Sequence, residues 1–377
     1  MVDVLLVGGG TAGHVLPAIA TAQTLMRLEP DIRLEFAGRA RSLEERLVSA
    51  AGLPFNVVDA VALPRRVSSE LVTVVPRLIA GVRSARRLLT ESGARSVASF
   101  GGYVALPLTL AARNRIPLIL HEQNSRPGLA NRLAARSADH IAVTFPSSSE
   151  GLRSRVRINI VGNPVQERIR DLDVVARRPE ALQRLGLSAE RRTLLVLGGS
   201  QGARSINRAV TAAADAWRAL NLQVVHLTGE RGYEESVAWW NSAGVDPDDP
   251  DVGIRVHAFA HDMSDVYAVA DLAVSRAGAT TLAELSVLGI PSILVPYPHA
   301  TAQHQDANAV ALVAAGAAVL VDDGTLSPEV LSSVVAALVG YPAGLLAMGR
   351  AARAWSRPDA AEALALLILS ALGTSDA

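Results

Sequence analysis

The chain opens with Val2-Asp3-Val4-Leu5-Leu6-Val7, followed at once by Gly8-Gly9-Gly10, and this stretch points to one class of fold. A short run dominated by apolar residues is typical of a parallel strand whose two faces are both covered by helices. The residues from Val15 to Leu28 then carry a helical pattern. The same order of strand, glycine turn and helix returns at Thr193–Leu197 and Gly198–Gly202, so the sequence predicts two Rossmann-like domains.

Further strands alternate with helices in both halves of the chain. In the first half we expect them at Ile32–Ala37, Ser96–Phe100, Leu118–His121, His140–Thr144 and Ile158–Val161. In the second half we expect them at Gln223–Thr228, Arg255–Phe259, Leu272–Ser275 and Ser292–Pro296. This alternation predicts an α/β fold with two doubly wound parallel sheets, joined near Gly162-Asn163-Pro164. Ligands of such sheets bind beyond the carboxyl ends of the strands, so two facing domains would enclose one central cleft.

The composition of the 377 residues excludes several classes of protein. Half of the residues are hydrophobic and 19% are charged, a balance that suits packed cores and is opposite to that of disordered chains. Cysteine is absent, which excludes disulfides, thiolate metal sites and cysteine nucleophiles. All 36 residues counted as lysine or arginine are arginines, which excludes a P-loop lysine and Schiff-base chemistry.

Charge and hydropathy bear on location. The N-terminus lacks the basic region of a signal peptide, and the best apolar run, Ala363–Leu369, is too short to span a membrane, so we expect a cytoplasmic protein. Up to Gly162 there are 20 arginines and 12 acidic residues, whereas from Asn163 onward there are 16 and 24. This asymmetry indicates that the first half alone meets an anionic surface, although charge also fluctuates by chance along a chain.

The first glycine turn has two interpretations. Its spacing Gly8-x-Gly10-x-x-Gly13 matches the dinucleotide-binding pattern, in which phosphate approaches the backbone at a helix N-terminus. A nicotinamide enzyme would also need an acidic residue after the next strand, where this chain has Ala37-Gly38-Arg39, so we expect no such cofactor.

His14 directly follows this glycine turn, at the start of the predicted helix. A helix N-terminus disfavours a protonated imidazole, so His14 would suit as general base for a sugar hydroxyl; the alternative is a histidine that only bonds the helix backbone.

Two segments of the second half suit a nucleotide diphosphate. Gly198-Gly199-Ser200-Gln201-Gly202 makes a turn that could receive a phosphate, or equally an ordinary connection. Ser275-Arg276-Ala277-Gly278 leads small residues and two threonines into a helix whose first N–H groups could bind phosphate. Glu284 lies about one turn inside that helix among apolar neighbours, where it could bind both hydroxyls of a ribose rather than face solvent. Gly289 is predicted to end the helix.

Polar residues also follow two strands. His121-Glu122-Gln123-Asn124 comes after a buried strand and could form the rim of a site. No second histidine stands at ligand spacing, so we expect no metal there. The stretch Pro298–Asn308 offers Gln303, His304 and Gln305 as candidate sugar contacts, although loop solubility alone would explain it.

A basic amphipathic helix is predicted in the first half. Pro76 would lie near its start, and Arg83, Arg86 and Arg87 fall beside an apolar stripe at helical spacing. Such a helix can lie on an anionic bilayer, and the alternative is a buried helix with a solvated charged edge. The local excess of arginine favours the bilayer. The stripe consists of Leu71, Val75, Leu78, Val82, Ala85 and Leu89.

Six motifs, in order along the chain, resemble the MurG family, the bacterial N-acetylglucosaminyltransferases that form lipid II for peptidoglycan. The resemblance runs from the first strand to about Gly316. The motifs are Gly9-Gly10-Thr11-Ala12-Gly13-His14, Gly101-Gly102-Tyr103, His121-Glu122-Gln123-Asn124, Gly162-Asn163-Pro164-Val165, Gly198-Gly199-Ser200-Gln201-Gly202-Ala203 and Ala279 through Glu284.

The resemblance implies a fold and a reaction. The fold would be GT-B, with an acceptor- and membrane-facing domain at 1–163, a domain binding UDP-N-acetylglucosamine (UDP-GlcNAc) at 164–353, and a final helix at 354–377 that packs back on the first domain. The enzyme would be an inverting hexosyltransferase. It would move N-acetylglucosamine to the 4-hydroxyl of N-acetylmuramic acid in undecaprenyl-diphospho-N-acetylmuramoyl-pentapeptide (lipid I), giving lipid II and UDP.

The resemblance also implies partners and a location. The enzyme would need no cofactor and no metal, because helix N–H groups would offset the charge on the departing UDP. It would be a peripheral protein on the cytoplasmic face of the cell membrane and would bind the anionic membrane surface and no nucleic acid. Its product would serve cell-wall synthesis, cell shape and cell division.

Site residues carry over from the family position by position. Thr11, Ala12 and Gly13 would border the nucleotide sugar, and His14 would take the proton from the acceptor hydroxyl. Asn124 and Gln305 would contact the sugar, Ser200 the phosphate, Ala260 the uracil through its backbone, and Glu284 the ribose. The donor would also touch Ala279, Thr280, Thr281, Leu282 and Ala283, the first three at its diphosphate.

The sequence departs from the family pattern at two positions, and two other functions are compatible with it. Ala12 stands where many relatives have glycine, and a positive φ there would be strained. Gln166 replaces an arginine that commonly follows the Gly-Asn-Pro-Val motif, so the sequence leaves open whether Gln166, Arg168 or neither supplies the diphosphate contact. The other interpretations are a different GT-B enzyme, such as a lipid glycosyltransferase or a UDP-GlcNAc 2-epimerase, and a nucleotide-binding protein without activity.

Overall fold

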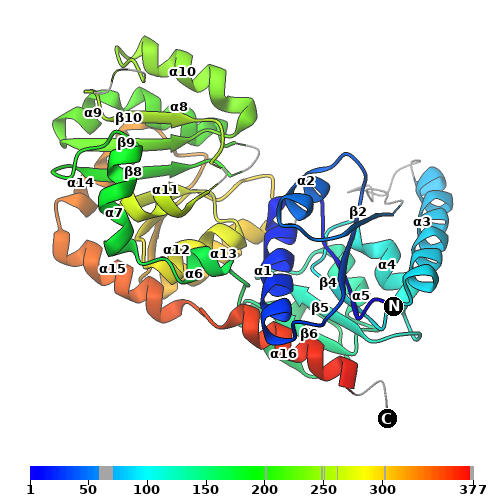
Figure 1. Ribbon diagram of the computed structural model, residues 1–377. Coiled ribbons are helices and arrows are strands. Elements are labelled where there is room, and N and C mark those ends of the chain that lie inside the picture. The colour runs from blue at the N-terminus through cyan, green and yellow to red at the C-terminus, as the bar shows by residue number, and fades with distance from the viewer. Residues whose placement is uncertain are drawn as a thin grey trace. The chain divides into compact units, whose positions relative to one another are not determined.

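The structure is a computed structural model that describes residues 1–58, 71–199, 202–247, 249, 251–260, 262–300 and 303–373 (Figure 1). The chain divides into two compact units: unit 1 is Met1–Gln166 with Arg357–Ala377, and unit 2 is Glu167–Ser356. Each unit contains one parallel sheet with helices on both faces. This confirms the predicted α/β class with two doubly wound sheets.

The sheet of unit 1 has seven parallel strands in the order β3-β2-β1-β4-β5-β6-β7. Its strands are β1 (Val4–Val7), β2 (Leu34–Gly38), β3 (Phe55–Val57), β4 (Ser96–Ser99), β5 (Leu118–Glu122), β6 (His140–Val143) and β7 (Ile158–Ile160). Its helices are α1 (Ala12–Leu28), α2 (Leu43–Ala50), α3 (Leu71–Ser92), α4 (Ala105–Ala112), α5 (Leu129–Ala134), the 3-10 turn η1 (Pro146–Gly151) and α16 (Ala360–Gly373).

Both faces of strand β1 are buried, which explains why its residues are apolar at every position. Val4 and Leu6 point to one face of the sheet and pack with α1, α2 and α16. Leu5 and Val7 point to the other face and pack with α3, α4 and α5. Side chains alternate between the faces of a strand, so a strand covered on both sides needs apolar residues throughout.

The sheet of unit 2 has six parallel strands in the order β10-β9-β8-β11-β12-β13. Its strands are β8 (Arg192–Leu197), β9 (Leu222–Leu227), β10 (Ile254–His257), β11 (Leu272–Ser275), β12 (Ser292–Leu294) and β13 (Ala318–Leu320). Its helices are α6 (Glu167–Arg170), α7 (Val174–Arg184), α8 (Arg204–Ala212), α9 (Ala214–Ala219), η2 (Glu230–Gly232), α10 (Tyr233–Ser242), α11 (Ser264–Val269), α12 (Ala279–Leu288), α13 (His304–Ala314), α14 (Pro328–Val339) and α15 (Pro342–Trp355).

Two cores lie on the faces of this second sheet. Helices α8, α9, α10 and α14 form one core with β8, β9, β11 and β12, centred on the buried Trp217 and Trp240. Helices α12, α13 and α15 pack on the other face around Leu282, Leu294 and Leu312. The expected strands are all present, with ends that differ by at most two residues from those predicted, whereas β3 and β13 were not predicted. Each of these two strands has only three residues and lies at the edge of its sheet, so its apolar pattern is weak.

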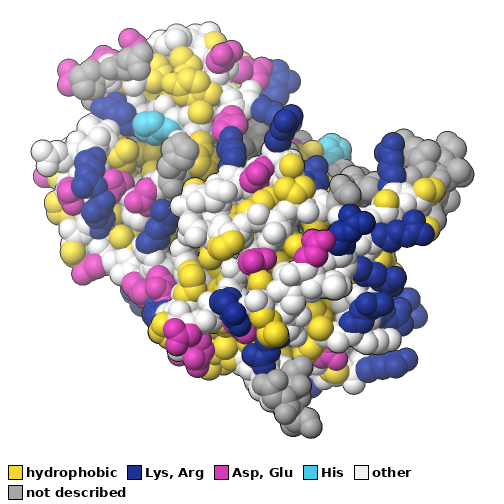
Figure 2. Space-filling view, turned by 45° about the vertical axis from the view of Figure 1, so that its right-hand side comes forward, with side chains coloured by type: hydrophobic (Ala, Val, Ile, Leu, Met, Phe, Trp, Pro, Cys, Tyr) yellow, Lys and Arg dark blue, Asp and Glu magenta, His cyan; other side chains and the backbone are white. Residues whose placement is uncertain are grey.

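Helix α3 differs from the membrane helix that the sequence predicted. Val82, Ala85 and Leu89 of its apolar stripe pack into the core of unit 1, so this part of the stripe is not available to a bilayer. Pro76 lies inside the helix rather than at its start. The side chains of Leu71 and Val75 lie outside the described residues. The solvent-facing side of α3 is basic, with exposed Arg77, Arg83, Arg86 and Arg87, and Figure 2 shows dark blue side chains gathered along one side of the surface.

Within the described ranges, no single helix is long and apolar enough to cross a bilayer. One bent pair, Pro328–Val339 with Pro342–Gly373, meets the criterion by length and composition alone.

Candidate active site

The glycine turn of unit 1 leads from β1 into α1. Thr11 precedes the helix with extended backbone (φ −151°, ψ 156°), and Ala12 is the first helical residue. Ala12 is therefore not among the residues with positive φ, and the strain expected for an alanine here is absent. The turn instead places its left-handed backbone at Gly10, whose φ is +87°.

His14 is the third residue of α1 and is partly buried. Its Nδ1 lies 3.0 Å from the Thr11 hydroxyl, and its backbone N–H donates to the Thr11 carbonyl at 3.2 Å. Both contacts come from the residue just before the helix. The imidazole is thus held at the carboxyl end of β1, at the edge of the sheet where α/β folds bind their ligands.

The loop after β4 packs directly on this turn. A Cβ atom on Gly102, which has φ +81°, would lie 2.1 Å from the carbonyl oxygen of Gly9, so only glycine allows the two loops to touch. The Tyr103 ring lies beside Gly10, where an added Cβ would be 3.0 Å from it. The motifs around His14 and Tyr103, which the sequence analysis treated separately, therefore form one surface.

Glu122 organises the neighbouring loop after β5. Its carboxyl group is buried and accepts four hydrogen bonds, two on each oxygen. Oε1 accepts from the backbone and side-chain nitrogens of Asn124 at 2.9 and 3.3 Å. Oε2 accepts from Gly128 N at 3.2 Å and Asn131 Nδ2 at 2.8 Å. Burial raises the pKa of Glu122, and these four donors offset part of that rise.

The predicted polar rim at His121–Asn124 is reduced to one residue. His121, Glu122 and Gln123 are each 1% exposed, and only Asn124 is partly accessible. His121 donates from Nε2 to the Gly162 carbonyl at 2.8 Å, and burial lowers its pKa to about 4, so it stays neutral. The rim prediction was wrong for these three residues because β5 lies between β4 and β6 and is covered on both faces as far as Glu122.

In unit 2, α12 begins shortly after β11, and its N-cap residue, Gly278, has no side chain with which to cap the helix. Gly278 precedes the helix in extended conformation, and Thr281 is partly exposed beside it. The first N–H groups of a helix lack intrahelical partners, so this end suits an anion. Leu282 packs into the core, which leaves only its backbone for a ligand. Gly289 ends the helix in left-handed conformation, as predicted.

Glu284 lies one turn inside α12 and is partly exposed. Its Oε2 accepts a hydrogen bond from the buried Tyr267 hydroxyl at 2.7 Å. Burial raises the pKa of Glu284 to about 7, and the Tyr267 hydrogen bond and the charge of Arg168 act in the opposite direction. Arg168 is half-exposed on α6 and also lies 4.0 Å from a carboxylate oxygen of Asp262.

Helix α13 is fastened to the turn before α12 by Asn308, whose Nδ2 donates to the Ala277 carbonyl at 3.1 Å. Gln305, in the first turn of α13, accepts from the Tyr297 backbone N–H at 2.9 Å. Ala260 follows β10 and is partly buried. Ser200, the predicted phosphate contact, lies outside the described residues.

Arg276 is a site-forming residue whose role the sequence analysis missed. Its guanidinium donates to Asp323 at 2.6 Å, to the Val295 and Pro296 carbonyls, and to the Ser205 hydroxyl at 2.9 Å. It thereby joins the carboxyl ends of β11 and β12 to the start of α8. The available signal was an arginine directly after a strand that is buried on both faces, where a charge needs partners.

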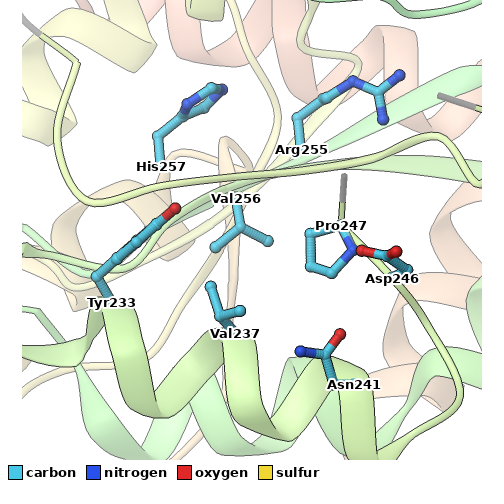
Figure 3. A pocket seen from close by; sticks show the side chains of 8 residues that line it. All are labelled: Tyr233, Val237, Asn241, Asp246, Pro247, Arg255, Val256 and His257. Carbon is cyan, nitrogen blue, oxygen red and sulfur yellow. The ribbon is translucent and has the colours of Figure 1, made fainter. Parts of the chain in front are cut away.

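A separate hollow of about 170 Å³ lies between α10 and the edge strand β10 (Figure 3). Val237 and Val256 point toward each other there, with Asn241 and Asp246 at one end. Burial and the nearby Arg255 lower the pKa of His257 on its wall. None of the predicted site residues lines this hollow. In the part of the chain that the structure describes, no group of three or more His, Asp or Glu side chains could hold a metal ion.

Comparisons with known proteins cover nearly the whole chain. Residues 4–143 match the glycosyltransferase family 28 N-terminal domain, and residues 193–364 match the glycosyltransferase family 28 C-terminal domain. A transferase of Nocardioides sp. is 42% identical over 99% of both chains, and one of Mycolicibacterium smegmatis is 42% identical over 98% of this chain and 94% of its own. Both are named UDP-N-acetylglucosamine–N-acetylmuramyl-(pentapeptide) pyrophosphoryl-undecaprenol N-acetylglucosamine transferase.

Solved structures agree with this relationship. Acinetobacter baumannii MurG is 27% identical with a TM-score of 0.75 and covers 98% of this chain and 100% of its own. A UDP-GlcNAc 2-epimerase from Neisseria meningitidis reaches a TM-score of 0.67 over 98% of this chain and 100% of its own, but at 14% identity it shares the fold alone. The chain therefore belongs to the family of UDP-N-acetylglucosamine–N-acetylmuramyl-(pentapeptide) pyrophosphoryl-undecaprenol N-acetylglucosamine transferases.

Proposed function

We propose that this chain is the transferase that moves N-acetylglucosamine from UDP-GlcNAc to lipid I and so forms lipid II for peptidoglycan. The observation that carries this conclusion is the 42% identity over 99% of both chains with a transferase of that name. The likeness to 2-epimerase structures is confined to the fold and gives no support for a second activity.

We propose that unit 2 binds the donor along the carboxyl ends of β11 and β12. The uncapped N-terminus of α12, with Ala279, Thr280 and Thr281, would receive the diphosphate through backbone N–H groups. Glu284 would bind the ribose hydroxyls, and Gln305 the sugar. Ala260 would approach the uracil through its backbone. As the glycosidic bond breaks, its electron pair leaves with UDP, and the N–H groups of α12 would stabilise the negative charge that develops.

We propose that His14 is the general base. The acceptor 4-hydroxyl would bond to the anomeric carbon with inversion and would lose its proton to the imidazole. For Nε2 to accept that proton, Nδ1 must carry the ring hydrogen and donate it to the Thr11 hydroxyl, which lies 3.0 Å away. Asn124 would contact the sugar from the loop that Glu122 holds in place.

We propose that the enzyme is peripheral on the cytoplasmic face of the membrane and binds through the basic side of α3. The support is the exposed row Arg77, Arg83, Arg86 and Arg87, together with the lipid acceptor of the named relatives. Arginine side chains attract anionic headgroups in a salt-dependent way. A variant with Arg83, Arg86 and Arg87 changed to glutamine should lose binding to vesicles that contain anionic lipid, measured by flotation. Unchanged binding would overturn this role for α3.

Transfer of label tests the proposed reaction directly. Purified protein is incubated with radiolabelled UDP-GlcNAc and a short-chain lipid I analogue, and the lipid fraction is extracted. Label should appear in a lipid product only when both substrates are present. Label that stays on UDP-GlcNAc would contradict the transferase, and conversion of the free nucleotide sugar to an epimer would instead support the epimerase interpretation.

A further inference from the structure

The buried Tyr267 and the partly exposed Glu284 form a pair that joins two helices of unit 2. Tyr267 lies on the short helix α11 and is 1% exposed. Its hydroxyl donates to Oε2 of Glu284 at 2.7 Å. Within the described part of the chain this is the one hydrogen bond that the Glu284 carboxylate receives, so Oε1 is left for another donor.

Contacts of α11, the helix that carries Tyr267, fix the position of the Tyr267 hydroxyl. Asp265, two residues earlier, pairs with Arg177 at 2.6 Å and Arg184 at 3.1 Å, both on α7. Asp262, just before the helix, accepts from the backbone and side chain of Ser264 at 2.9 and 2.7 Å. The tyrosine ring has little freedom in such a setting, because it is buried and the start of its helix is held by the contacts of Ser264 and Asp265.

We propose that Tyr267 is a positioning residue for the donor: it anchors one carboxylate oxygen of Glu284 and so presents the other to the ribose hydroxyls. This inference rests on the proposed role of Glu284 in donor binding. A carboxylate held by one oxygen does not have to be oriented by the ligand, and removing that ordering cost strengthens binding. Among the described residues the Tyr267 hydroxyl bonds to Glu284 alone, and a phenylalanine ring would fill the same volume without that bond.

The electrostatics give the pair a measurable signature. Tyr267 on α11 and Arg168 on α6 are the groups that favour the charged form of Glu284, and burial favours the neutral form, which leaves its pKa at about 7. Ribose hydroxyls donate hydrogen bonds, so they bind the ionised carboxylate better. Binding of UDP-GlcNAc therefore releases a proton from Glu284 near neutral pH. Loss of the Tyr267 hydroxyl should raise the pKa of Glu284 and so move this proton release to higher pH.

The test is the affinity of Tyr267→Phe for UDP-GlcNAc, measured by calorimetry between pH 6 and 9 without acceptor. UDP-GlcNAc is the suitable probe because its diphosphate is esterified at both ends and does not titrate in this range. At pH 7 we expect a dissociation constant about 5- to 10-fold higher than in the parent protein, with the midpoint of the pH profile shifted upward. The turnover at saturating donor should change less than 2-fold.

Two further variants separate the possible failures. Tyr233→Phe, on α10, is a matched control and should bind as the parent does. Glu284→Gln should bind weakly at every pH, and the double variant Tyr267→Phe/Glu284→Gln should be no weaker. If Glu284→Gln binds normally, the proposed ribose contact is wrong. If Glu284→Gln is impaired while Tyr267→Phe keeps both the affinity and the pH profile of the parent, the positioning role is overturned.

A measurement on the unmodified enzyme covers the case in which Tyr267→Phe does not fold. Calorimetry of UDP-GlcNAc binding at pH 7 in two buffers of different ionisation enthalpy reports the number of protons released. We expect a fractional release that disappears above pH 8.5. No release at pH 7 would contradict the arrangement, because the ribose would then not be meeting a carboxylate that is partly protonated.

Discussion

Each unit of this protein holds a glutamate near the carboxyl edge of its sheet, and the two carboxyl groups differ in exposure and in the number of hydrogen bonds they accept. Glu122 in unit 1 is 1% exposed and accepts four hydrogen bonds, all from its own loop and α5. Glu284 in unit 2 is partly exposed and, among the residues that the structure describes, accepts one hydrogen bond, from Tyr267. Burial raises the pKa of both carboxyl groups.

The difference teaches that the number of hydrogen-bond donors around a carboxylate, rather than its burial, separates a structural carboxylate from one that can bind a ligand. The acceptor sites of Glu122 are used inside the protein, so its removal should be felt as lost stability. Glu284 has an oxygen to spare, so its removal should be felt as lost binding.

The largest effect is expected for Glu122→Gln. The amide NH2 group of the glutamine would replace one carboxylate oxygen and would face the two N–H groups that now donate to that oxygen. Each buried N–H group left without an acceptor costs about 1–3 kcal/mol. We expect unit 1 to lose roughly 2–4 kcal/mol of stability. All four tryptophans lie in unit 2, so the early loss should appear in far-UV circular dichroism during urea unfolding while tryptophan fluorescence follows its parental course. Coincident early transitions in both signals would contradict the confinement to unit 1.

His14→Ala is expected to act on turnover alone. Loss of a general base costs about 100-fold in rate, and the donor site in unit 2 is untouched. Steady-state kinetics should show a kcat lowered by about 100-fold, with the dissociation constant for UDP-GlcNAc unchanged. His140→Ala, at the start of β6, serves as the control and should retain full turnover. A normal kcat in His14→Ala would remove the imidazole from the mechanism.

The affinity for UDP-GlcNAc should depend on pH through Glu284. Its pKa in the free enzyme is about 7, and binding favours the ionised form, so affinity should fall by up to about 10-fold per pH unit below 7 and level off above it. The stability of unit 2 depends on pH in the opposite direction. The protonated Glu284 carboxyl stabilises the fold most below its ordinary pKa, and this stabilisation is lost as the pH rises toward 7. Glu284→Gln should flatten both dependences, and calorimetry and urea unfolding check them.

The smallest effect is expected for Arg168→Gln. Arg168 is half-exposed and lowers the pKa of Glu284 through its charge, so salt screens its influence. We expect donor affinity to fall by about 2- to 5-fold at low salt and by less at 0.5 M salt. Arg218→Gln on α9 provides a control of similar exposure. A loss above 50-fold would mean that Arg168 contacts the diphosphate itself.

Much of the fold could be predicted from local pattern. The buried strands, both glycine turns and the left-handed cap at Gly289 each follow from residues adjacent in sequence. The edge strands β3 and β13 escaped because three residues carry no usable period. The stripe of α3 was assigned to a bilayer because periodicity shows that a face is apolar but not what covers it.

The candidate site was less predictable, because its supports are distant in sequence. Tyr267 meets Glu284 across 17 residues, and Arg276 meets Ser205 across 71. No local spacing encodes such pairs. His121 and Gln123 had the right chemistry for a rim, but strand β5 continues to Glu122 and buries them. The roles given to His14 and Glu284 stay predictions that the variants above will test, and those of Thr11 and the other residues of α12 stay predictions.

The most direct test of the contrast is the dissociation constant for UDP-GlcNAc in Glu284→Gln and Glu122→Gln, measured side by side by calorimetry at pH 8 and low temperature. We predict that Glu284→Gln binds at least about 10-fold more weakly than the parent, as expected for loss of a charge-assisted hydrogen bond, whereas Glu122→Gln binds within 2-fold of it. Normal binding by Glu284→Gln together with impaired binding by Glu122→Gln would contradict the account.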